Sequence, residues 1–501
     1  LQRAIVAVGL AATLGGLHAA ELSVTTAEVV SLCGRDQGLF SIVGLGGAGS
    51  VKLATELAGT GRILVHGIAL SDTELKAARQ AVGAAGLAGF VSVEMLPLTP
   101  VPYRNNLVNA MIVPDLAKAE AAGFSQAEAL KAVAPHGKLC VRKGGTWTVM
   151  EREMPTGMDE WTHNIHGPDG NRISNDTVVG FPVGYRWHAG LPFNINNRKR
   201  AGNRYSSTRG MAISGGRCFT FSDSEIDNLK GAYFLGQELD QYVTARDAFN
   251  GTFLWRKKIG GVYYGGLWYM NLAPFAAVDD AVYTVCEEGD LLVLNAATGE
   301  EIRRIDTTYA PGELLVDKGV LVAATWKGGT QAGRSKVNRY ERRRMHSAFA
   351  EGVVEAFRTD SGSKLWDLPC LATSIRSAEG VLFLSRREGP DLLEESRRYK
   401  PKTKEPAPEA TEEEVPPARP SQAVVAVDLR TGKVLWEAKA ADFGGEGFEQ
   451  EHMRLDAVGS GVVSVIHSRD LRTDKVTMLS ARTGEVVLQK ETGGFPILLG
   501  N

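Results

Sequence analysis

Hydrophobic and polar residues follow two different patterns along this chain of 501 residues. From residue 21 to about residue 155, short apolar runs alternate with segments in which apolar residues recur at helical spacing. This pattern predicts strands at 39–43, 63–67, 91–95, 110–113 and 138–142, and helices at 51–57, 72–85 and 125–133. Strands that alternate with helices form βαβ units, so this part is predicted to be an α/β domain with a parallel sheet.

The pattern changes after about residue 155. Helical periodicity ends, and short runs rich in Val, Leu, Tyr and Phe alternate with Gly, Asp, Asn and Thr. Short apolar runs that are separated by turn-forming residues are typical of an all-β region. We therefore predict an all-β fold over residues 156–501.

The all-β region contains a repeat in which a strand, an Asp or Asn, a Thr-Gly pair and a second strand follow one another. The copies span residues 245–255, 295–303, 356–366, 426–436 and 480–488, with glycines at 251, 299, 362, 432 and 484. Glycine takes a positive φ in such a hairpin without steric cost, and a Trp ends three copies. Long periods of this kind predict propeller blades, with each Trp covering the joint to a neighbouring blade.

The two longest intervals between copies hold charged insertions. Residues 334–344 are basic, and residues 400–420 hold six of the twenty prolines together with three consecutive glutamates. Pro-rich, charged segments cannot bury enough apolar surface to order themselves, so a disordered insertion is predicted at about 388–420. Both insertions are interpreted as surface loops, and a docking site is the alternative.

The repeat resembles the tryptophan-docking motif of pyrroloquinoline-quinone (PQQ)-type β-propellers, which include quinoprotein dehydrogenases and the propeller lipoprotein of outer-membrane protein assembly. Residues 426–436 match every specified position of Ala-x-Asp-x-x-Thr-Gly-x-x-x-Trp, and residues 245–255 differ only at Asn250. The resemblance covers roughly residues 160–501 and implies a PQQ-like β-propeller. Complete members have seven or eight blades, so five copies lead us to expect a small, irregular ring or a propeller that is incomplete at the C-terminus.

A catalytic member of this family would bind PQQ and usually calcium, and an adjacent Cys pair would cap the quinone. The chain has no adjacent Cys pair, and no catalytic residue or metal ligand is assigned. A PQQ-dependent oxidoreductase is kept as an alternative. Residues 160–172 resemble the stretch that opens many of these propellers, so His163, His166 and Asp169 belong either to a structural entry strand or to a metal or ligand site.

A glycine-rich loop follows the first predicted strand. Gly44, Gly46, Gly47 and Gly49 allow the backbone to turn tightly and to approach a cofactor, and the helix that follows presents its N-terminus to an anionic or polar group. These four glycines are the predicted cofactor-binding residues, together with Asp72 as the candidate acidic ligand. A strand before the loop and a helix after it strengthen the signal.

Residues 30–150 resemble a Rossmann-like class I S-adenosylmethionine (SAM)-dependent methyltransferase domain, through this loop and through residues 132–141, where His136 replaces a glycine. The family places an acidic residue at the end of the second strand, where this chain has Ala69, and Asp72 follows three residues later. An Asp expected after the third strand is replaced by Pro97. We therefore predict a degenerate domain; a working methyltransferase and an NAD-type site that uses Asp72 are the alternatives.

The N-terminus has the layout of a secretory signal peptide. Arg3 precedes an apolar run over residues 4–17, which is followed by Ala19 and Ala20. The run is too short for a membrane-spanning helix, so no membrane segment is expected after cleavage. We predict a protein exported to the periplasm or outside the cell; an apolar helix of the first domain is the alternative.

Composition narrows the function classes. The net charge is −2, with 23% charged and 44% hydrophobic residues, so there is no electrostatic footprint for nucleic acid. The five cysteines form no Cys-x-x-Cys, which excludes a zinc ribbon, a thioredoxin motif and c-type haem attachment. Most are predicted to be buried free thiols.

These features together resemble an exported bacterial fusion of a methyltransferase-like domain with a PQQ-like propeller. The predicted organisation is a signal peptide at 1–20, the α/β domain at 21–155 and the propeller at 156–501. The predicted function is a non-catalytic binding or scaffold module, with the propeller face available to a protein partner. Neither SAM nor PQQ is supported by a complete motif.

Overall fold

A computed structural model describes most of the two predicted regions. The described residues are 24–180, 184–189, 208–223, 241–260, 274–286, 289–327, 351–388, 421–443, 452–468 and 475–491. The predicted signal peptide at 1–20, the basic insertion at 334–344 and residues 389–420 of the predicted disordered insertion lie outside these residues.

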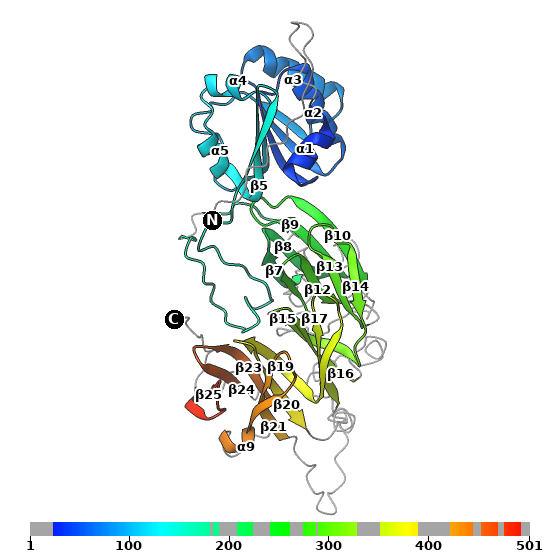
Figure 1. Cartoon of the computed structure of the whole chain (residues 1–501), viewed down its shortest axis with the longest axis vertical. Helices are drawn as coiled ribbons and strands as arrows, with labels where there is room; N and C mark the ends of the chain where they lie inside the picture. Colours follow the sequence, from blue (N-terminus) through cyan, green and yellow to red (C-terminus); the bar gives the residue numbers. More distant parts are fainter. Residues whose placement is uncertain are drawn as a thin grey trace, which may run out of the picture.

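Residues 24–151 form an α/β unit at one end of the long axis of the molecule (Figure 1). Its sheet has the spatial order β3-β2-β1-β4-β5-β6; the first five strands are parallel and β6 is antiparallel. The strands are β1 (Gly38–Val43), β2 (Ile63–Ile68), β3 (Val91–Glu94), β4 (Val108–Val113), β5 (Val133–Lys143) and β6 (Thr146–Glu151). The predicted parallel sheet is confirmed, and β6 was not predicted.

Helices cover both faces of this sheet. They are α1 (Thr26–Cys33), α2 (Ala48–Gly59), α3 (Asp72–Ala84), α4 (Leu116–Ala121) and α5 (Gln126–Ala132). Alternate strand residues point to opposite faces, so Phe40 and Ile42 pack with α1, α2 and α3, whereas Val43 packs with α4 and α5. Cover on both faces explains why β4 is apolar and buried along nearly its whole length.

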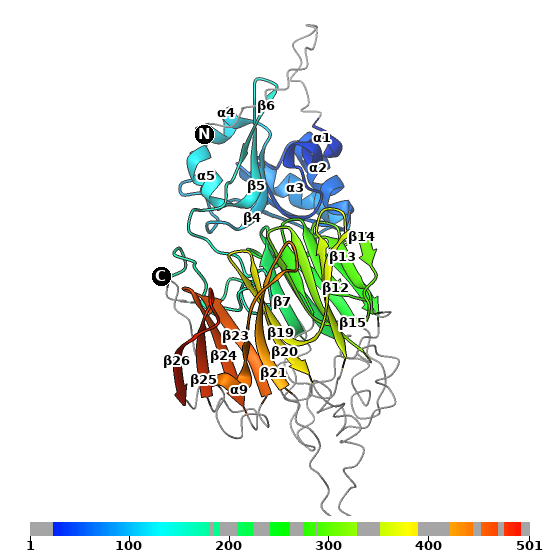
Figure 2. The same ribbon diagram turned by 60° about the horizontal axis from the view of Figure 1, so that its bottom comes forward.

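The rest of the described chain is built from five antiparallel sheets of four consecutive strands each, which follow one another along an arc (Figures 1 and 2). The sheets are β7 (Thr208–Ser214), β8 (Arg217–Asp223), β9 (Gln241–Asp247) and β10 (Phe253–Gly260); β11 (Ala276–Val278), β12 (Ala281–Val285), β13 (Leu291–Asn295) and β14 (Glu301–Ile305); β15 (Ala310–Asp317), β16 (Val320–Trp326), β17 (Gly352–Arg358) and β18 (Lys364–Pro369); β19 (Leu371–Ala378), β20 (Val381–Glu388), β21 (Ser421–Asp428) and β22 (Val434–Lys439); β23 (His452–Gly459), β24 (Val462–Ser468), β25 (Lys475–Ser480) and β26 (Val486–Glu491). A short helix, α9 (Ala440–Phe443), follows β22. Four-stranded sheets of this kind are consistent with the predicted propeller blades.

Each copy of the sequence repeat forms the hairpin between the third and fourth strands of one sheet. The hairpin glycines have φ values from +73° to +76°. Trp255 lies over Gly299 of the next sheet and donates its indole N–H to the Ala296 carbonyl at 3.0 Å. Trp366 and Trp436 dock in the same way on the fourth and fifth sheets. The predicted covering of the joints by tryptophan is therefore confirmed.

One joint departs from this pattern, and the first hairpin is covered from outside the repeats. Arg303 takes the place of Trp in the second copy: its aliphatic part lies against Gly362, and its guanidinium donates to the Asp360 carbonyl at 2.7 Å. The first hairpin is covered by Trp187, which comes from residues 184–189 and donates to the Ala248 carbonyl at 2.9 Å. Trp187 precedes every copy of the repeat, so repeat counting does not find it.

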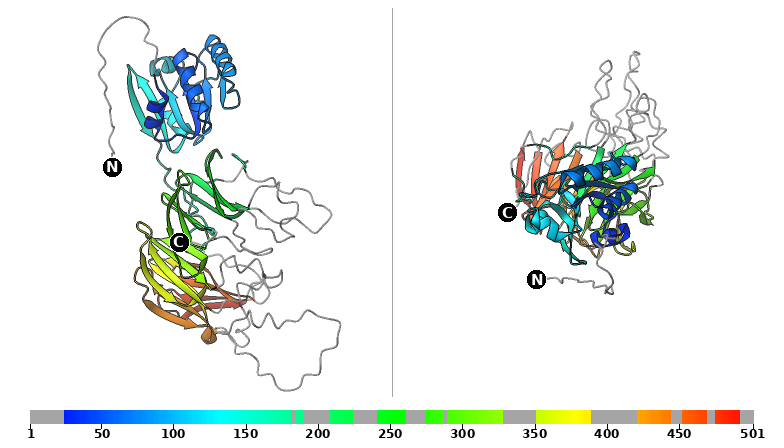
Figure 3. Two further views of the ribbon diagram at one scale, coloured as in Figure 1. Left: turned by 90° about the vertical axis from the view of Figure 1, so that its right-hand side faces the viewer. Right: turned by 90° about the horizontal axis from the view of Figure 1, so that it is seen from above.

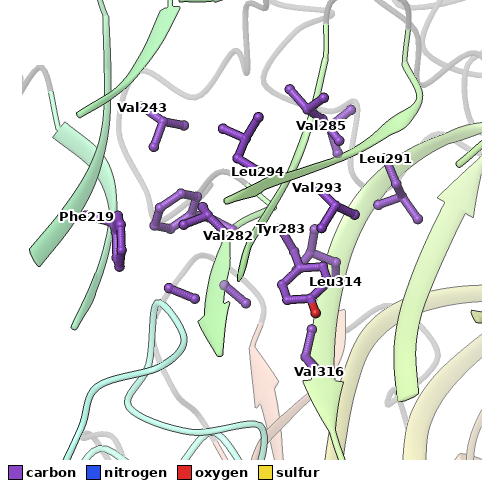
Figure 4. Packing of buried hydrophobic residues seen from close by; sticks show 14 of the residues in the cluster. Phe219, Val243, Val282, Tyr283, Val285, Leu291, Val293, Leu294, Leu314 and Val316 are labelled. Atoms are coloured by element: carbon purple, nitrogen blue, oxygen red, sulfur yellow. The ribbon is translucent and has the colours of Figure 1, made fainter. Parts of the chain in front are cut away.

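The largest apolar core lies among the first three sheets (Figure 4). Figure 4 shows Phe219 and Val243 of the first sheet facing Val282 and Leu294 of the second, with Leu314 of the third nearby. Figure 3 shows that the α/β unit, in blue and cyan, lies next to the first of these sheets, in green. No helix among the described residues is long and apolar enough to cross a membrane.

Candidate functional site

The glycine-rich loop lies where the sequence predicts it, between β1 and α2. Gly44 has a φ of +83°, a conformation that favours glycine, and the N–H groups of Gly44 and Leu45 both donate to the Ile68 carbonyl at 2.8 and 2.9 Å. Gly47 is the N-cap of α2, and Gly49 lies in its first turn. These contacts hold the loop against the carboxyl end of β2.

The close approach at Gly46 is made by a side chain of this protein. A Cβ on Gly46 would lie 2.1 Å from the Cβ of Glu74. The Glu74 carboxylate accepts from the Leu70 N–H at 2.9 Å and pairs with the Lys118 ammonium. The neighbouring residue Leu45 makes an equally tight contact with β2: it is fully buried, and its side chain packs directly on Gly67. Glycine is therefore required here by internal packing.

Asp72 lies apart from this contact. It is the first residue of α3 and is exposed, whereas Glu74, one half-turn further on, faces the loop. The serine before them, Ser71, caps α3 by accepting from the Glu74 N–H at 3.3 Å. The Ser-x-x-Glu spacing is a capping-box signal, and it could have identified Glu74 from the sequence. The role predicted for Asp72 stays a prediction.

These residues do not fit a SAM ribose as the family would bind it. A ribose needs a carboxylate that can accept its hydroxyl protons at the end of β2. The carboxylate beside the loop belongs to Glu74, and it is already engaged by a backbone N–H and by a lysine. The space left by the missing side chain of Gly46 is filled by Glu74 of α3.

A row of hydrogen-bonded polar side chains runs across the sheet on the face covered by α4 and α5. Ser41 of β1 and His66 of β2 are direct neighbours in the sheet. The Tyr103 hydroxyl lies 2.7 Å from Ser41 Oγ and 2.5 Å from His66 Nδ1, and Glu94 lies 3.5 Å from the other ring nitrogen. Burial raises the pKa of Tyr103, which stays a neutral phenol. Ser41 and His66 are polar residues in otherwise apolar strands. This signal was present in the sequence, but it was not used to predict the row of polar side chains.

The first two of the five sheets contact the α/β unit at the amino ends of its parallel strands. Asn109, near the start of β4, donates to the Asp247 carboxylate at 2.6 Å, and Asn250 donates to the Leu107 carbonyl at 2.9 Å. Gln37, just before β1, donates to the Ala297 carbonyl at 3.1 Å. The glycine-rich loop lies at the carboxyl ends. The loop and the sheets are therefore at opposite edges of the α/β sheet.

The segment that enters the sheets, residues 159–172, is called the hub segment below. It contacts the first strand of all five sheets. Its backbone pairs with Ile213 of β7 through Trp161, and its carbonyls accept from Ala277, Ser377 and Val458, at 2.8 Å in each case. The contact with β15 is made by a side chain, because the Val316 N–H donates to His163 Nε2 at 3.0 Å. The segment therefore has structural contacts, as predicted, but it forms isolated bridges and not the predicted entry strand.

The two histidines of the hub segment are engaged within the protein. His163 Nδ1 lies 2.8 Å from the Thr162 hydroxyl, and burial lowers the pKa of His163 to about 3. His166 Nε2 lies 2.7 Å from the Asp159 carboxylate. In the described part of the chain, no group of three His, Cys, Asp or Glu side chains is arranged to hold a metal ion. The metal-site alternative for His163, His166 and Asp169 thus finds no geometric support there.

Charged side chains beside the hub segment are paired with one another. Arg376 binds the Glu313 carboxylate at 2.7 Å, and Arg172 binds the buried Asp456 carboxylate at 2.5 Å. Arg376 also donates to the Asp456 carbonyl at 3.0 Å. PQQ carries carboxylates, which need cations that are free to bind them. Since the carboxylates of this chain already occupy these two arginines, the hub does not fit PQQ at this position.

No family model matches the chain, and no curated protein matches it. Among solved structures it is similar to the quinohemoprotein alcohol dehydrogenase ADHIIG of Pseudomonas putida HK5, with 14% identity over 56% of this chain and 41% of that chain and a TM-score of 0.33. BamB from Moraxella catarrhalis is 15% identical over 56% of this chain and 72% of that chain, with a TM-score of 0.26.

The α/β unit has likenesses of its own. A protein of Methanococcus maripaludis described as an S-adenosyl-L-methionine-dependent methyltransferase is 16% identical over 24% of this chain and 54% of that chain, with a TM-score of 0.20. The chain spans less than two thirds of the length of this protein and of the dehydrogenase. At these scores we draw no functional conclusion from the likenesses.

Proposed function

We propose that the protein is an exported, non-catalytic binding or scaffold module. In this proposal residues 1–20 are a signal peptide, residues 21–155 are a degenerate methyltransferase-like domain, and residues 156–501 are a PQQ-like propeller whose face binds a protein partner. One observation carries the proposal. The glycine-rich loop, which is the best cofactor signal in the sequence, is packed from within by Glu74.

The packing at Gly46 makes cofactor binding costly. A ligand that approached this glycine would have to displace Glu74 and so break its bond with the Leu70 N–H and its ion pair with Lys118. A hydrogen bond to a charged group contributes about 1.5–3 kcal/mol, which the ligand would have to replace. The propeller side of the molecule supports a rigid platform, since its sheets are joined by docked tryptophans and by the hub segment.

Thermal unfolding with added ligands tests the absence of cofactor binding. The protein without its predicted signal peptide would be heated with SAM, with its demethylated product, and with PQQ plus calcium. A ligand present at about 100 times its Kd adds about 2.7 kcal/mol to the stability of the native state, which is a readable rise in Tm. We expect no rise with any of them. A rise with SAM would overturn the proposal for the α/β unit.

Two matched variants sharpen this test. Glu74→Ala removes the Cγ that lies against Gly46 and the carboxylate that binds the Leu70 N–H and Lys118, so it is the variant in which SAM binding would first be detected. Asp72→Ala removes an exposed carboxylate two residues away and serves as the control. If SAM raised the Tm of the wild-type protein and Asp72→Ala alone abolished this rise, the predicted role of Asp72 would be supported and the argument from Glu74 would fail.

Methyl transfer is the second candidate function. It is favoured by the position of the carboxyl edge, because the described contacts with the first two sheets lie at the opposite, amino edge of the α/β sheet. A methyltransferase would show SAM binding in the same experiment. Export is tested separately, by fusing residues 1–20 to a reporter enzyme that is active only outside the cytoplasm; an inactive fusion would contradict the predicted location.

A further inference from the structure

Two cysteines from distant parts of the sequence meet inside the α/β unit. Cys33 is the last residue of α1, and Cys140 lies in the middle of β5. Their sulfur atoms are 3.8 Å apart, and both side chains are buried in the same apolar core. The contact joins the first described helix of the chain to a central strand of the sheet.

We propose that Cys33 and Cys140 form a disulfide when the protein meets a thiol–disulfide oxidant such as oxidised glutathione. The sulfurs are already in van der Waals contact, so a disulfide requires them to move about 1.8 Å closer. The proposal is independent of the proposed function.

The surroundings of the pair favour the reaction. α1 is a short helix of eight residues that ends at Cys33, where Gly34 adopts a left-handed conformation. Lys138 lies on the same strand as Cys140, two residues earlier, and its ammonium reaches Gly34. The contact with Cys33 and this ammonium together lower the pKa of Cys140, whereas the same contact and burial raise the pKa of Cys33, so Cys140 is the thiol that attacks first. A lowered pKa increases the fraction of the reactive thiolate.

The exchange has two steps. The Cys140 thiolate attacks one sulfur of oxidised glutathione, forms a mixed disulfide and releases one glutathione thiolate. Cys33, after losing its proton, attacks the Cys140 sulfur and releases the second glutathione. The two protein thiols lose two electrons and two protons in total, and oxidised glutathione gains them as two molecules of glutathione. Because both sulfurs are buried, the oxidant reaches them when α1 opens locally.

Thiol counting and peptide mapping test the proposal on the full chain. The protein would be purified reduced and equilibrated with oxidised glutathione until the count of thiols, measured in denaturant, is constant. We expect the five thiols to fall to three. Trypsin without reductant should release the peptide of residues 139–142 joined to the peptide that ends at Arg35. Thermal unfolding should show a higher Tm for the oxidised protein.

Single-cysteine variants identify the pair. Cys33→Ser and Cys140→Ser should each abolish the joined peptide and the rise in Tm. Cys218→Ser, which removes a buried thiol in β8 of the first sheet, should keep both. The proposal fails if the wild-type protein keeps five thiols at equilibrium, or if the joined peptides contain any other pair of cysteines.

Discussion

Glycine serves the same purpose in the α/β unit and in the five sheets, although its sequence context indicates different functions in the two regions. In the sheets, Gly432 lies under the ring of Trp366, as the repeat predicts. In the α/β unit, Gly46 belongs to a loop typical of cofactor binding, yet it lies against Glu74. A glycine at such a position indicates that something approaches closely, and only the structure identifies what approaches.

The comparison would be tested most strongly at the sheet joint. Gly432→Ala places a methyl group 2.7 Å from the Trp366 ring at a φ of +73°. Backbone strain and overpacking together should destabilise the protein by about 4 kcal/mol. Gly461→Ala is the matched control, because Gly461 has nearly the same φ, +74°, and open space around its Cβ position. It should cost about 1 kcal/mol, from strain alone. Thermal unfolding measures both; equal losses would mean that the Trp contact contributes nothing.

The glycine-rich loop supplies the parallel test in the other region. Gly46→Ala places a methyl group against Glu74, including a backbone atom at 2.9 Å, and should cost about 3 kcal/mol through overpacking. Gly83→Ala, within α3 and with open space at its Cβ position, should raise stability by about 0.5–1 kcal/mol, since alanine is the better helix former. If Gly46→Ala were as stable as the wild type, there would be free space at Gly46, which would contradict the proposed function.

Sequence patterns predicted local structure well in both regions because local rules govern it. The hairpins follow from a side chain that accepts turn N–H groups, as Asp428 does for Thr431 at 2.8 Å, and from a glycine at positive φ. The parallel sheet follows from apolar strands between helices. Such features depend on residues that are close in the sequence.

Contacts between distant segments were not predictable in the same way. Trp187 covers the first hairpin without belonging to any repeat. The hub segment reaches four of the five sheets through backbone groups, whose partners a sequence does not reveal, and the third sheet through the side chain of His163. Glu74 was overlooked because the family comparison directed attention to Asp72. In each case a long-range partner, invisible in a single sequence, decides what the residue does.

Acid should destabilise the sheets through His163. Its folded pKa is lowered to about 3 by burial and by the nearby Arg376 and His166, whereas an unfolded histidine titrates near 6.5. Below pH 6.5 the unfolded chain therefore binds a proton that the folded chain does not bind, so stability falls as pH falls from 6.5 towards 3. Between pH 7 and pH 5 the loss should be about 2 kcal/mol.

Tryptophan fluorescence during thermal unfolding at several pH values measures this loss, because seven of the eight tryptophans follow residue 155. His163→Gln keeps an acceptor for the Val316 N–H without a titrating group, so it should remove about 2 kcal/mol of the pH dependence. His467, in the fifth sheet, also has a pKa lowered to about 3, and His467→Gln should remove a similar, independent part. An unchanged pH profile in His163→Gln would show that the hub segment does not keep this ring neutral.

The smallest expected effect lies where the two regions meet. Asn250 is the single departure of the first repeat from the motif, and its amide donates to the Leu107 carbonyl and to Asn109, both at 2.9 Å. Asn250→Thr restores the motif but removes both donors, so it should cost about 1 kcal/mol. Thr431→Asn makes the reverse change in the fourth hairpin, which has an exposed tip, and should stay within about 0.5 kcal/mol of the wild type. Equal Tm values for the two variants would mean that Asn250 is ordinary variation in the repeat. A lower Tm in Asn250→Thr alone would mean that Asn replaces the Thr of the motif because it binds the α/β unit.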